Sequence, residues 1–92
     1  KLGWEGKIKF HQPSIYFSLF DVNNLPMKGA QVTLHVSRVI EKGYDFQTSL
    51  KYLKDGIYAQ DIIFPLKGQW EVLVLVEWKQ QYFQQRKRII VK

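Results

Sequence analysis

Residues 56–76 read GIYAQDIIFPLKGQWEVLVLV, and this stretch decides the fold. Its apolar side chains recur at every second position, which is the period of a half-buried β-strand, whereas a helix would repeat every third or fourth residue. Trp70, Val72, Val74, Val76 and then Trp78 share one face of this strand. Burying apolar surface stabilises the folded chain by roughly 25 cal/mol per Å². We therefore expect this face to form the centre of the core.

The same alternation divides the chain into seven short strands separated by turn signals. The predicted strands are residues 4–10, 14–22, 30–39, 44–53, 57–64, 69–78 and 82–91. The intervening NNLPMKG and KDG segments carry the Asn, Asp, Pro and Gly residues that tight turns require. No segment has a convincing helical period. The pattern predicts an all-β fold, an immunoglobulin-like antiparallel β-sandwich, with residues 1–92 as a single domain.

The composition argues against several classes of function. Hydrophobic residues make up 46% of the chain and charged residues 24%, which is a globular balance. Cysteine is absent, so a disulfide, a thiolate metal site and a cysteine nucleophile are excluded. His11, His35 and Met27 lack the spacing of metal ligands, and no hydrolase, P-loop or dinucleotide motif occurs. We predict no catalytic or metal site, no cofactor and no small-molecule substrate.

The positive charge is concentrated near the carboxyl end. Residues 79–92 contain no acid and supply +5 of the net charge of +6, through Lys79, Arg86, Lys87, Arg88 and Lys92. This segment could form a solvated strand face, or it could contact an acidic partner or anionic lipid headgroups. Nucleic acid is the least favoured explanation, because only Tyr82 and Phe83 supply the interleaved aromatics of such modules.

A second apolar surface is predicted on the other face of the central strand. Leu73 and Leu75 lie there between acidic residues, and other apolar side chains occupy comparable off-phase positions, namely Tyr16, Phe20, Ile62 and Phe64. The KQQ turn should bring Arg86 and Arg88, which are in phase on the last strand, next to these leucines. An apolar centre with a basic rim is typical of contact surfaces. We therefore name Leu73, Leu75, Arg86 and Arg88 the candidate contact surface. The alternative is that the EKG connection covers the leucines.

Two charged residues share the phase of apolar neighbours. Asp61 is in phase with Ile57 and Ile63, and Arg38 is in phase with Val36. An inward charge without a partner is costly, so a partly buried Asp61–Arg38 pair is one way to satisfy both residues. Acid–base catalysis by this pair is disfavoured, because arginine does not release its proton.

From Ser14 onward the chain contains, in order, the segments FDVNNLPMKGAQV, SRV, DGIYAQ, FPLKGQWEV and RKRIIV. Taken together, these segments resemble the FixH (CcoH) family. The GxY and PxxGxW core also occurs in YtkA-like domains and macroglobulin-type sandwiches, and Tyr58 resembles a tyrosine corner, whose hydroxyl bonds to a nearby backbone group. All the residues carried over are fold determinants, so the resemblance implies no catalytic residue; the set is Gly29, Gly56, Tyr58, Pro65, Gly68 and Trp70.

The resemblance also implies a setting and a partner. FixH-like proteins have one amino-terminal transmembrane helix and a periplasmic β-sandwich, and they are associated with assembly of the cbb(3)-type cytochrome c oxidase. The chain begins at Lys1 without an initiator methionine, so we expect that helix upstream, at the periplasmic face of the bacterial inner membrane. The expected partner is an oxidase subunit or a copper-transporting ATPase. Two alternatives stay open: a periplasmic copper-handling domain, or a generic immunoglobulin-like module of a larger surface protein.

Overall fold

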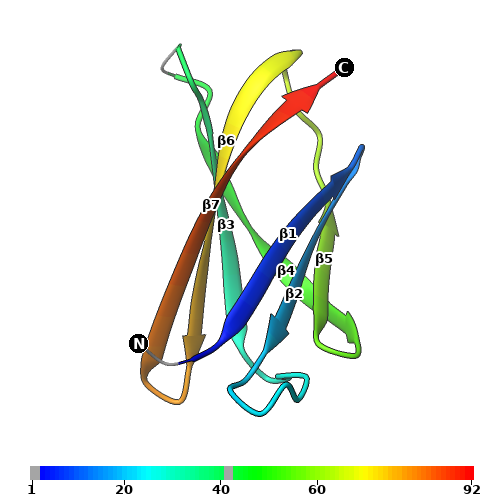
Figure 1. Ribbon diagram of the computed structural model, residues 1–92. Coiled ribbons are helices and arrows are strands. Elements are labelled where there is room, and N and C mark those ends of the chain that lie inside the picture. Colours follow the sequence, from blue (N-terminus) through cyan, green and yellow to red (C-terminus); the bar gives the residue numbers. More distant parts are fainter. Residues whose placement is uncertain (1–2, 41–42) are drawn as a thin grey trace.

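The described residues form seven β-strands and no helix (Figure 1). The computed structural model describes residues 3–40 and 43–92. The strands are β1 (Glu5–His11), β2 (Ser14–Phe20), β3 (Gln31–Arg38), β4 (Phe46–Lys54), β5 (Ile57–Asp61), β6 (Gly68–Trp78) and β7 (Gln81–Val91). The predicted all-β class and the seven predicted strands are confirmed.

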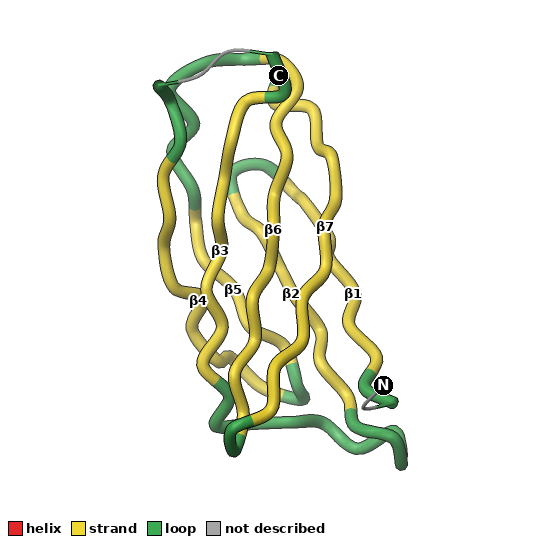
Figure 2. The backbone as a smooth tube through the Cα atoms, turned by 90° about the vertical axis from the view of Figure 1, so that its left-hand side faces the viewer, coloured by secondary structure: helices red, strands yellow, loops and turns green. Residues whose placement is uncertain are grey.

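The strands belong to one antiparallel sheet that folds over into two layers. Its order is β1-β2-β5-β4-β3-β6-β7. The first half of β4 pairs with β3, and from Lys51 onward β4 pairs with β5. Within this second pairing the register shifts between Tyr52 and Lys54. β4 therefore passes from one layer to the other, as the tube in Figure 2 shows. The sandwich is one nearly closed sheet rather than two separate sheets.

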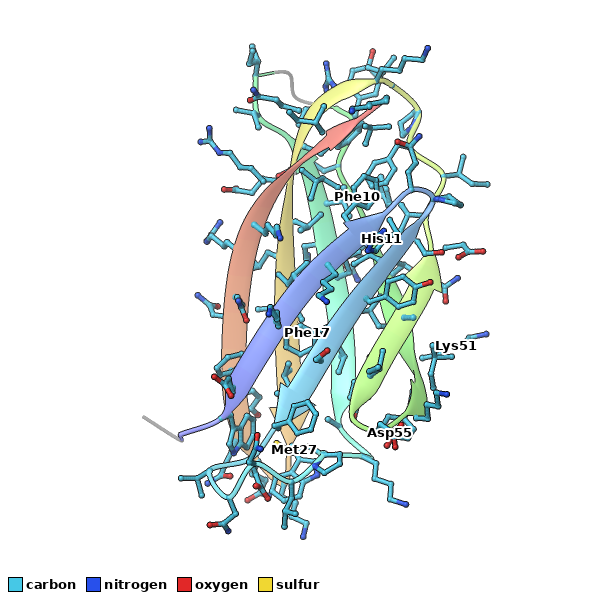
Figure 3. All side chains as sticks on the ribbon, turned by 45° about the vertical axis from the view of Figure 1, so that its right-hand side comes forward. Phe10, His11, Phe17, Met27, Lys51 and Asp55 are labelled. Carbon is cyan, nitrogen blue, oxygen red and sulfur yellow. The ribbon has the colours of Figure 1, made fainter. Side chains whose placement is uncertain are left out.

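The core lies between the two layers and follows the predicted alternation. Ile15, Phe17 and Leu19 of β2 are fully buried opposite the valines of β6, and Trp70 is also fully buried, as predicted. The Trp70 indole Nε1 donates to the Leu66 carbonyl at 3.0 Å, so its one polar group is satisfied. Figure 3 shows Phe17 pointing between the layers. Stability therefore rests on interdigitated aliphatic and aromatic side chains.

The end of β5 differs from the prediction. β5 stops at Asp61, and the Ile62 amide then donates to the Pro13 carbonyl at 2.8 Å. This bond turns Ile62 into the core and leaves Ile63 exposed. Phe64 packs edge-to-face against Phe10, with ring centroids 5.7 Å apart. The predicted outward positions of Ile62 and Phe64 are therefore wrong, because they share the phase of Tyr58, which is buried.

The suggested Asp61–Arg38 pair is not formed. Asp61 is exposed and accepts a hydrogen bond from the Ser14 hydroxyl. Arg38 Nη1 donates to the Lys67 carbonyl at 2.6 Å, and its guanidinium lies 5.2 Å from the centre of the Trp70 ring. Asp61 points outward because the inward phase of β5 is that of Tyr58, which is buried.

Two fold determinants fasten the loops to the core. Gly56 has φ +80°, and a Cβ there would lie 2.8 Å from the Leu19 carbonyl oxygen, so both backbone conformation and space favour glycine. The Tyr58 hydroxyl donates to the Met27 carbonyl at 2.8 Å and accepts from the Ala30 amide at 3.2 Å. The expected tyrosine bond to backbone exists, but it reaches a loop about 30 residues earlier rather than a nearby group.

The remaining fold determinants lie in connections between strands. Gly29 has φ +80° in the β2–β3 loop, and Gly68 has φ +112° at the start of β6. A Cβ on Gly68 would lie 3.1 Å from Arg38 Nη1, so this glycine leaves room for the guanidinium. Pro65 is exposed in the connection between β5 and β6. These residues shape the scaffold that carries the candidate contact surface.

Candidate protein-contact surface

The four residues of the candidate contact surface lie together on the outer face of β6 and β7. Leu73 pairs across the strands with Arg86, and Glu71 pairs with Arg88. Side chains of directly opposed residues point to the same side of a sheet. The two leucines and the two arginines therefore occupy one face, as the sequence predicted for the β6–β7 pair.

β3 extends this surface on the other side of β6. His35 lies opposite Leu73, and Thr33 lies opposite Leu75. Both leucines are half-buried by these neighbours. Tyr82 on β7 is 70% exposed and lines a shallow hollow together with Leu75. The outer face thus carries an apolar strip, whereas the outer face of a sandwich is ordinarily polar. Of the EKG connection, residues 41 and 42 lie outside the described residues, so the covering alternative is not tested.

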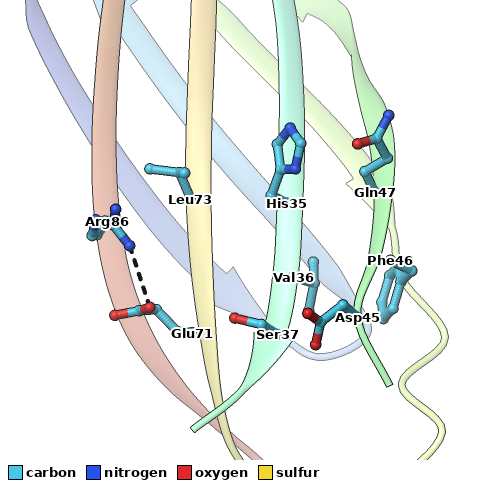
Figure 4. A pocket seen from close by; sticks show the side chains of 9 residues that line it. All are labelled: His35, Val36, Ser37, Asp45, Phe46, Gln47, Glu71, Leu73 and Arg86. Carbon is cyan, nitrogen blue, oxygen red and sulfur yellow. Dashed lines mark hydrogen bonds and ion pairs between the residues drawn. The ribbon is translucent and has the colours of Figure 1, made fainter. Parts of the chain in front are cut away.

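A hollow of about 430 Å³ lies beside Leu73. Figure 4 shows it between β4, β3, β6 and β7, with a floor of strand backbone and these side chains around it: His35, Val36, Ser37, Asp45, Phe46, Gln47, Glu71, Leu73 and Arg86. Both acidic and basic groups are present at its rim. The hollow is therefore a mixed polar and apolar depression on the same face as the candidate contact surface.

The basic rim is only loosely held. Arg86 Nη1 lies 3.4 Å from Glu71 Oε1, and the side chain of Arg86 is 58% exposed. An ion pair this accessible contributes little to stability, because water and salt screen it. The planar guanidinium can instead hold a partner carboxylate through two hydrogen bonds. Arg88 is exposed beside it. Both arginines are therefore accessible to a partner.

Sequence reasoning missed three features of this surface. It did not foresee the Arg86–Glu71 pair, the position of His35 opposite Leu73, or the contribution of Tyr82. Tyr82 could have been found, because it is in phase with Arg86 on the predicted last strand. The place of His35 depends on β3 pairing with β6 rather than with β2, which local alternation does not indicate.

The histidines lie apart from each other. His11 ends β1 and is exposed beside Tyr16, with ring centroids 6.3 Å apart, near the strand tip in Figure 3. His35 lies on β3. Across residues 3–40 and 43–92, no group of three or more His, Cys, Asp or Glu side chains could hold a metal ion. Over the same ranges, no helix has the length and apolar character needed to cross a membrane.

One titratable group deep in the fold has a shifted pKa. Burial raises the pKa of Tyr58 above its ordinary value, the hydrogen bond from the Ala30 amide partly offsets this, and nearby Tyr52 raises it further. A raised pKa keeps the hydroxyl protonated, as the bond that it donates to the Met27 carbonyl requires. Tyr58 therefore has a structural role in the fold and is not part of the candidate contact surface.

The fold defines the class of protein: an all-β, sandwich-like domain with an apolar strip on its outer face. The FixH family model matches residues 1–90 of the 92-residue chain. The chain belongs to the FixH family, and the resemblance noted from the sequence is confirmed. No curated protein and no solved structure matches it.

Proposed function

We propose that this chain is a non-catalytic, membrane-anchored domain that acts by protein contact in the assembly or stabilisation of a cbb(3)-type cytochrome c oxidase. In this proposal it lies at the periplasmic face of the bacterial inner membrane, and its partner is an oxidase subunit or a copper-transporting ATPase. The observation that carries the proposal is the candidate contact surface on the outer face of β6 and β7 in a chain of the FixH family.

The scaffold does not need this surface for its own core. On the inner face of β6 the side chains from Trp70 to Val76 are buried, and Leu73 and Leu75 on the other face add nothing between the layers. Exposed apolar strips rimmed by polar groups mark interaction sites. A partner that offers an apolar side chain to the hollow and a carboxylate to Arg86 or Arg88 would match both features.

Membrane anchoring would compensate for a small contact. Stable interfaces bury about 800 Å² per partner, which is more than four side chains provide. Two proteins confined to the same membrane meet at a high effective concentration, so a weaker contact suffices. The expected interaction is therefore weak for the isolated domain and measurable only when the domain is anchored.

The experiment replaces Leu75 and Arg88 together by glutamate in the anchored protein, in cells that lack their own copy. Docking predicts a folded domain that no longer co-purifies with its partner and no longer supports oxidase assembly. The matched control is Lys51→Glu with Leu53→Glu, which changes one base and one exposed leucine on β4 in the same way. The control variant should still co-purify with the partner and support oxidase assembly.

Two outcomes would contradict the proposal. If the Leu75→Glu, Arg88→Glu protein unfolds, the leucine strip is part of the core. If it folds and oxidase assembly is unchanged, the docking surface lies elsewhere.

A copper(I) titration with a competing chelator separates this proposal from copper handling. We expect no stoichiometric copper binding tighter than micromolar by the isolated domain. A one-to-one isotherm that His35→Ala abolishes would favour the copper-handling alternative.

A further inference from the structure

The two edges of the sheet, β1 and β7, meet through side chains. They lie side by side and run in the same direction (Figures 1 and 2). In the part of the chain that the structure describes, no backbone ladder joins them. Lys87 Nζ donates to the Ile8 carbonyl at 3.1 Å. The Gln12 side chain donates to the Lys92 carbonyl at 2.9 Å and accepts from the Lys92 amide at 3.0 Å. We call this boundary the β1/β7 seam.

Polar residues occupy core-facing positions of β7 at the seam. Gln85 lies opposite Val74 and Lys87 lies opposite Val72, so both are in phase with the buried Ile89. Gln85 Oε1 is buried and has no hydrogen-bond partner among residues 3–40 and 43–92. A Cβ on Gly6 would lie 2.7 Å from this oxygen, so glycine leaves the room that Gln85 takes. A buried acceptor without a donor is unfavourable, so the closed seam leaves one polar group unsatisfied.

We propose that the β1/β7 seam accepts an extended acidic segment of a partner protein as an added strand. The side-chain amide of Gln12 forms two hydrogen bonds with the backbone of Lys92. A residue of a neighbouring strand would form the same pair of bonds. The Ile8 carbonyl likewise accepts a bond from a side chain. Backbone groups on both edges thus face the seam and are hydrogen-bonded to side chains, which an incoming strand could displace. Strand addition requires such accessible backbone groups.

The charges around the seam select the partner chemistry. β1 and β7 together carry one acid, Glu5, and five bases: Lys7, Lys9, Arg86, Lys87 and Arg88. Lys87 is exposed but occupies an inward-phase position of an edge strand, and a charge at such a position disfavours indiscriminate pairing. A carboxylate on the incoming strand binds the Lys87 ammonium and releases the Ile8 carbonyl for a backbone donor. An acidic strand therefore gains an ion pair with Lys87, whereas a neutral or basic strand displaces the Lys87 ammonium from the Ile8 carbonyl without replacing that bond. The proposal does not depend on the proposed oxidase partner.

The test uses a synthetic ten-residue peptide of alternating Glu and Thr, with alternating Lys and Thr as the charge-reversed control. Binding to the isotopically labelled domain is followed by backbone amide NMR shifts and by amide hydrogen exchange. We expect the acidic peptide to shift and protect amides of β1 and β7, with affinity that falls as salt is added, and the basic peptide to bind at least about tenfold more weakly.

Variants assign the effect to the seam. Lys87→Glu should weaken binding of the acidic peptide by at least about tenfold, whereas Lys51→Glu, the same charge change on the exposed face of β4, should weaken it far less. If Lys87→Glu does not fold, Lys87→Gln makes the same comparison. The proposal is overturned by equal binding of both peptides, by shifts confined to the outer face of β3 and β6, or by no shift at millimolar peptide. The Lys87 and Lys51 variants leave Leu75 and Arg88 unchanged, so this comparison is separate from the variant that tests the proposed function.

Discussion

The two faces of β6 have the same alternating pattern but different surroundings. Trp70, Val72 and Val74 on the inner face are fully buried between the layers. Leu73 and Leu75 on the outer face are half-buried, and their cross-strand neighbours lie on β3 and β7. An apolar residue on this strand can therefore either hold the fold together or remain available to a partner. The difference lies in whether a second layer covers it.

The strongest test of this contrast is to remove a large inner side chain. Trp70→Ala should lower the free energy of unfolding by about 3–5 kcal/mol, because it leaves a cavity that the surrounding strands cannot close. Leu73→Ala on the outer face should lower it by less than about 1 kcal/mol, because solvent already reaches that side chain. Urea melts of both variants measure the two values. Equal losses would mean that the outer face is as tightly packed as the core.

The second test compares two glycines that have the same backbone angle. Gly56 and Gly29 both have φ +80°, but only Gly56 faces the core, where a Cβ would meet the Leu19 carbonyl oxygen. Gly56→Val should lower the free energy of unfolding by about 3 kcal/mol through strain and a clash. Gly29→Val, with nothing within 4 Å, should lower it by about 1 kcal/mol through strain alone. A neutral Gly56→Val in a denaturant melt would contradict the hairpin.

The third test removes the buried hydroxyl that fastens the β2–β3 loop. Tyr58→Phe leaves the Met27 carbonyl without this donor and should lower the free energy of unfolding by about 1–2 kcal/mol. Tyr82→Phe, on the exposed outer surface, should have no measurable effect. Thermal or urea unfolding near neutral pH measures both. A neutral Tyr58→Phe would mean that the loop is held by its other contacts.

The same residue predicts a dependence on alkaline pH. Burial raises the pKa of Tyr58 in the folded state above the value of about 10 in the unfolded chain. Its contribution to stability is therefore fully present below pH of about 10 and is lost as the pH rises through the folded-state pKa. The free energy of unfolding, measured between neutral and strongly alkaline pH, should decline more steeply for the natural chain than for Tyr58→Phe. Parallel profiles would show that Tyr58 does not ionise differently on folding.

The smallest expected effect concerns the outer face itself. Leu75→Glu should change the free energy of unfolding by less than about 0.5 kcal/mol, because the side chain is only half-buried and reaches solvent. Circular dichroism and a urea melt check this. A loss comparable to that of Trp70→Ala would place Leu75 in the core and remove the basis of the contact surface.

Much of the fold followed from the sequence because strand alternation is a local property. β6 was predicted at residues 69–78 and is observed at Gly68–Trp78, and the sides of Trp70 and Leu73 follow from its phase. β5 was extended three residues too far, and its inward phase was assigned to Ile57 instead of Tyr58, which placed Ile62 and Asp61 on the wrong sides. The bond from Ile62 to Pro13 ends the strand, and nothing in residues 57–64 indicates that bond.

The candidate contact surface was partly predictable. Leu73, Leu75, Arg86 and Arg88 were identified because consecutive strands joined by a short turn pair with each other, so phase alone places them on one face. Their role in binding stays a prediction. The hollow beside Leu73 was not predictable, because it also requires β3 and β4, whose places in the sheet are not set by short turns to β6.

The sequence by itself determined the strands, the turns and the two faces of each strand, since these depend on residue types and spacing within a few positions. Only the tertiary structure decided the strand order, the passage of β4 between layers, the reach of Tyr58 to Met27 and the side-chain closure of the β1/β7 seam. These features join residues far apart in the chain. They form because the two layers must bury their apolar faces together and satisfy the polar groups left at the edges, and that balance of free energy belongs to the whole fold.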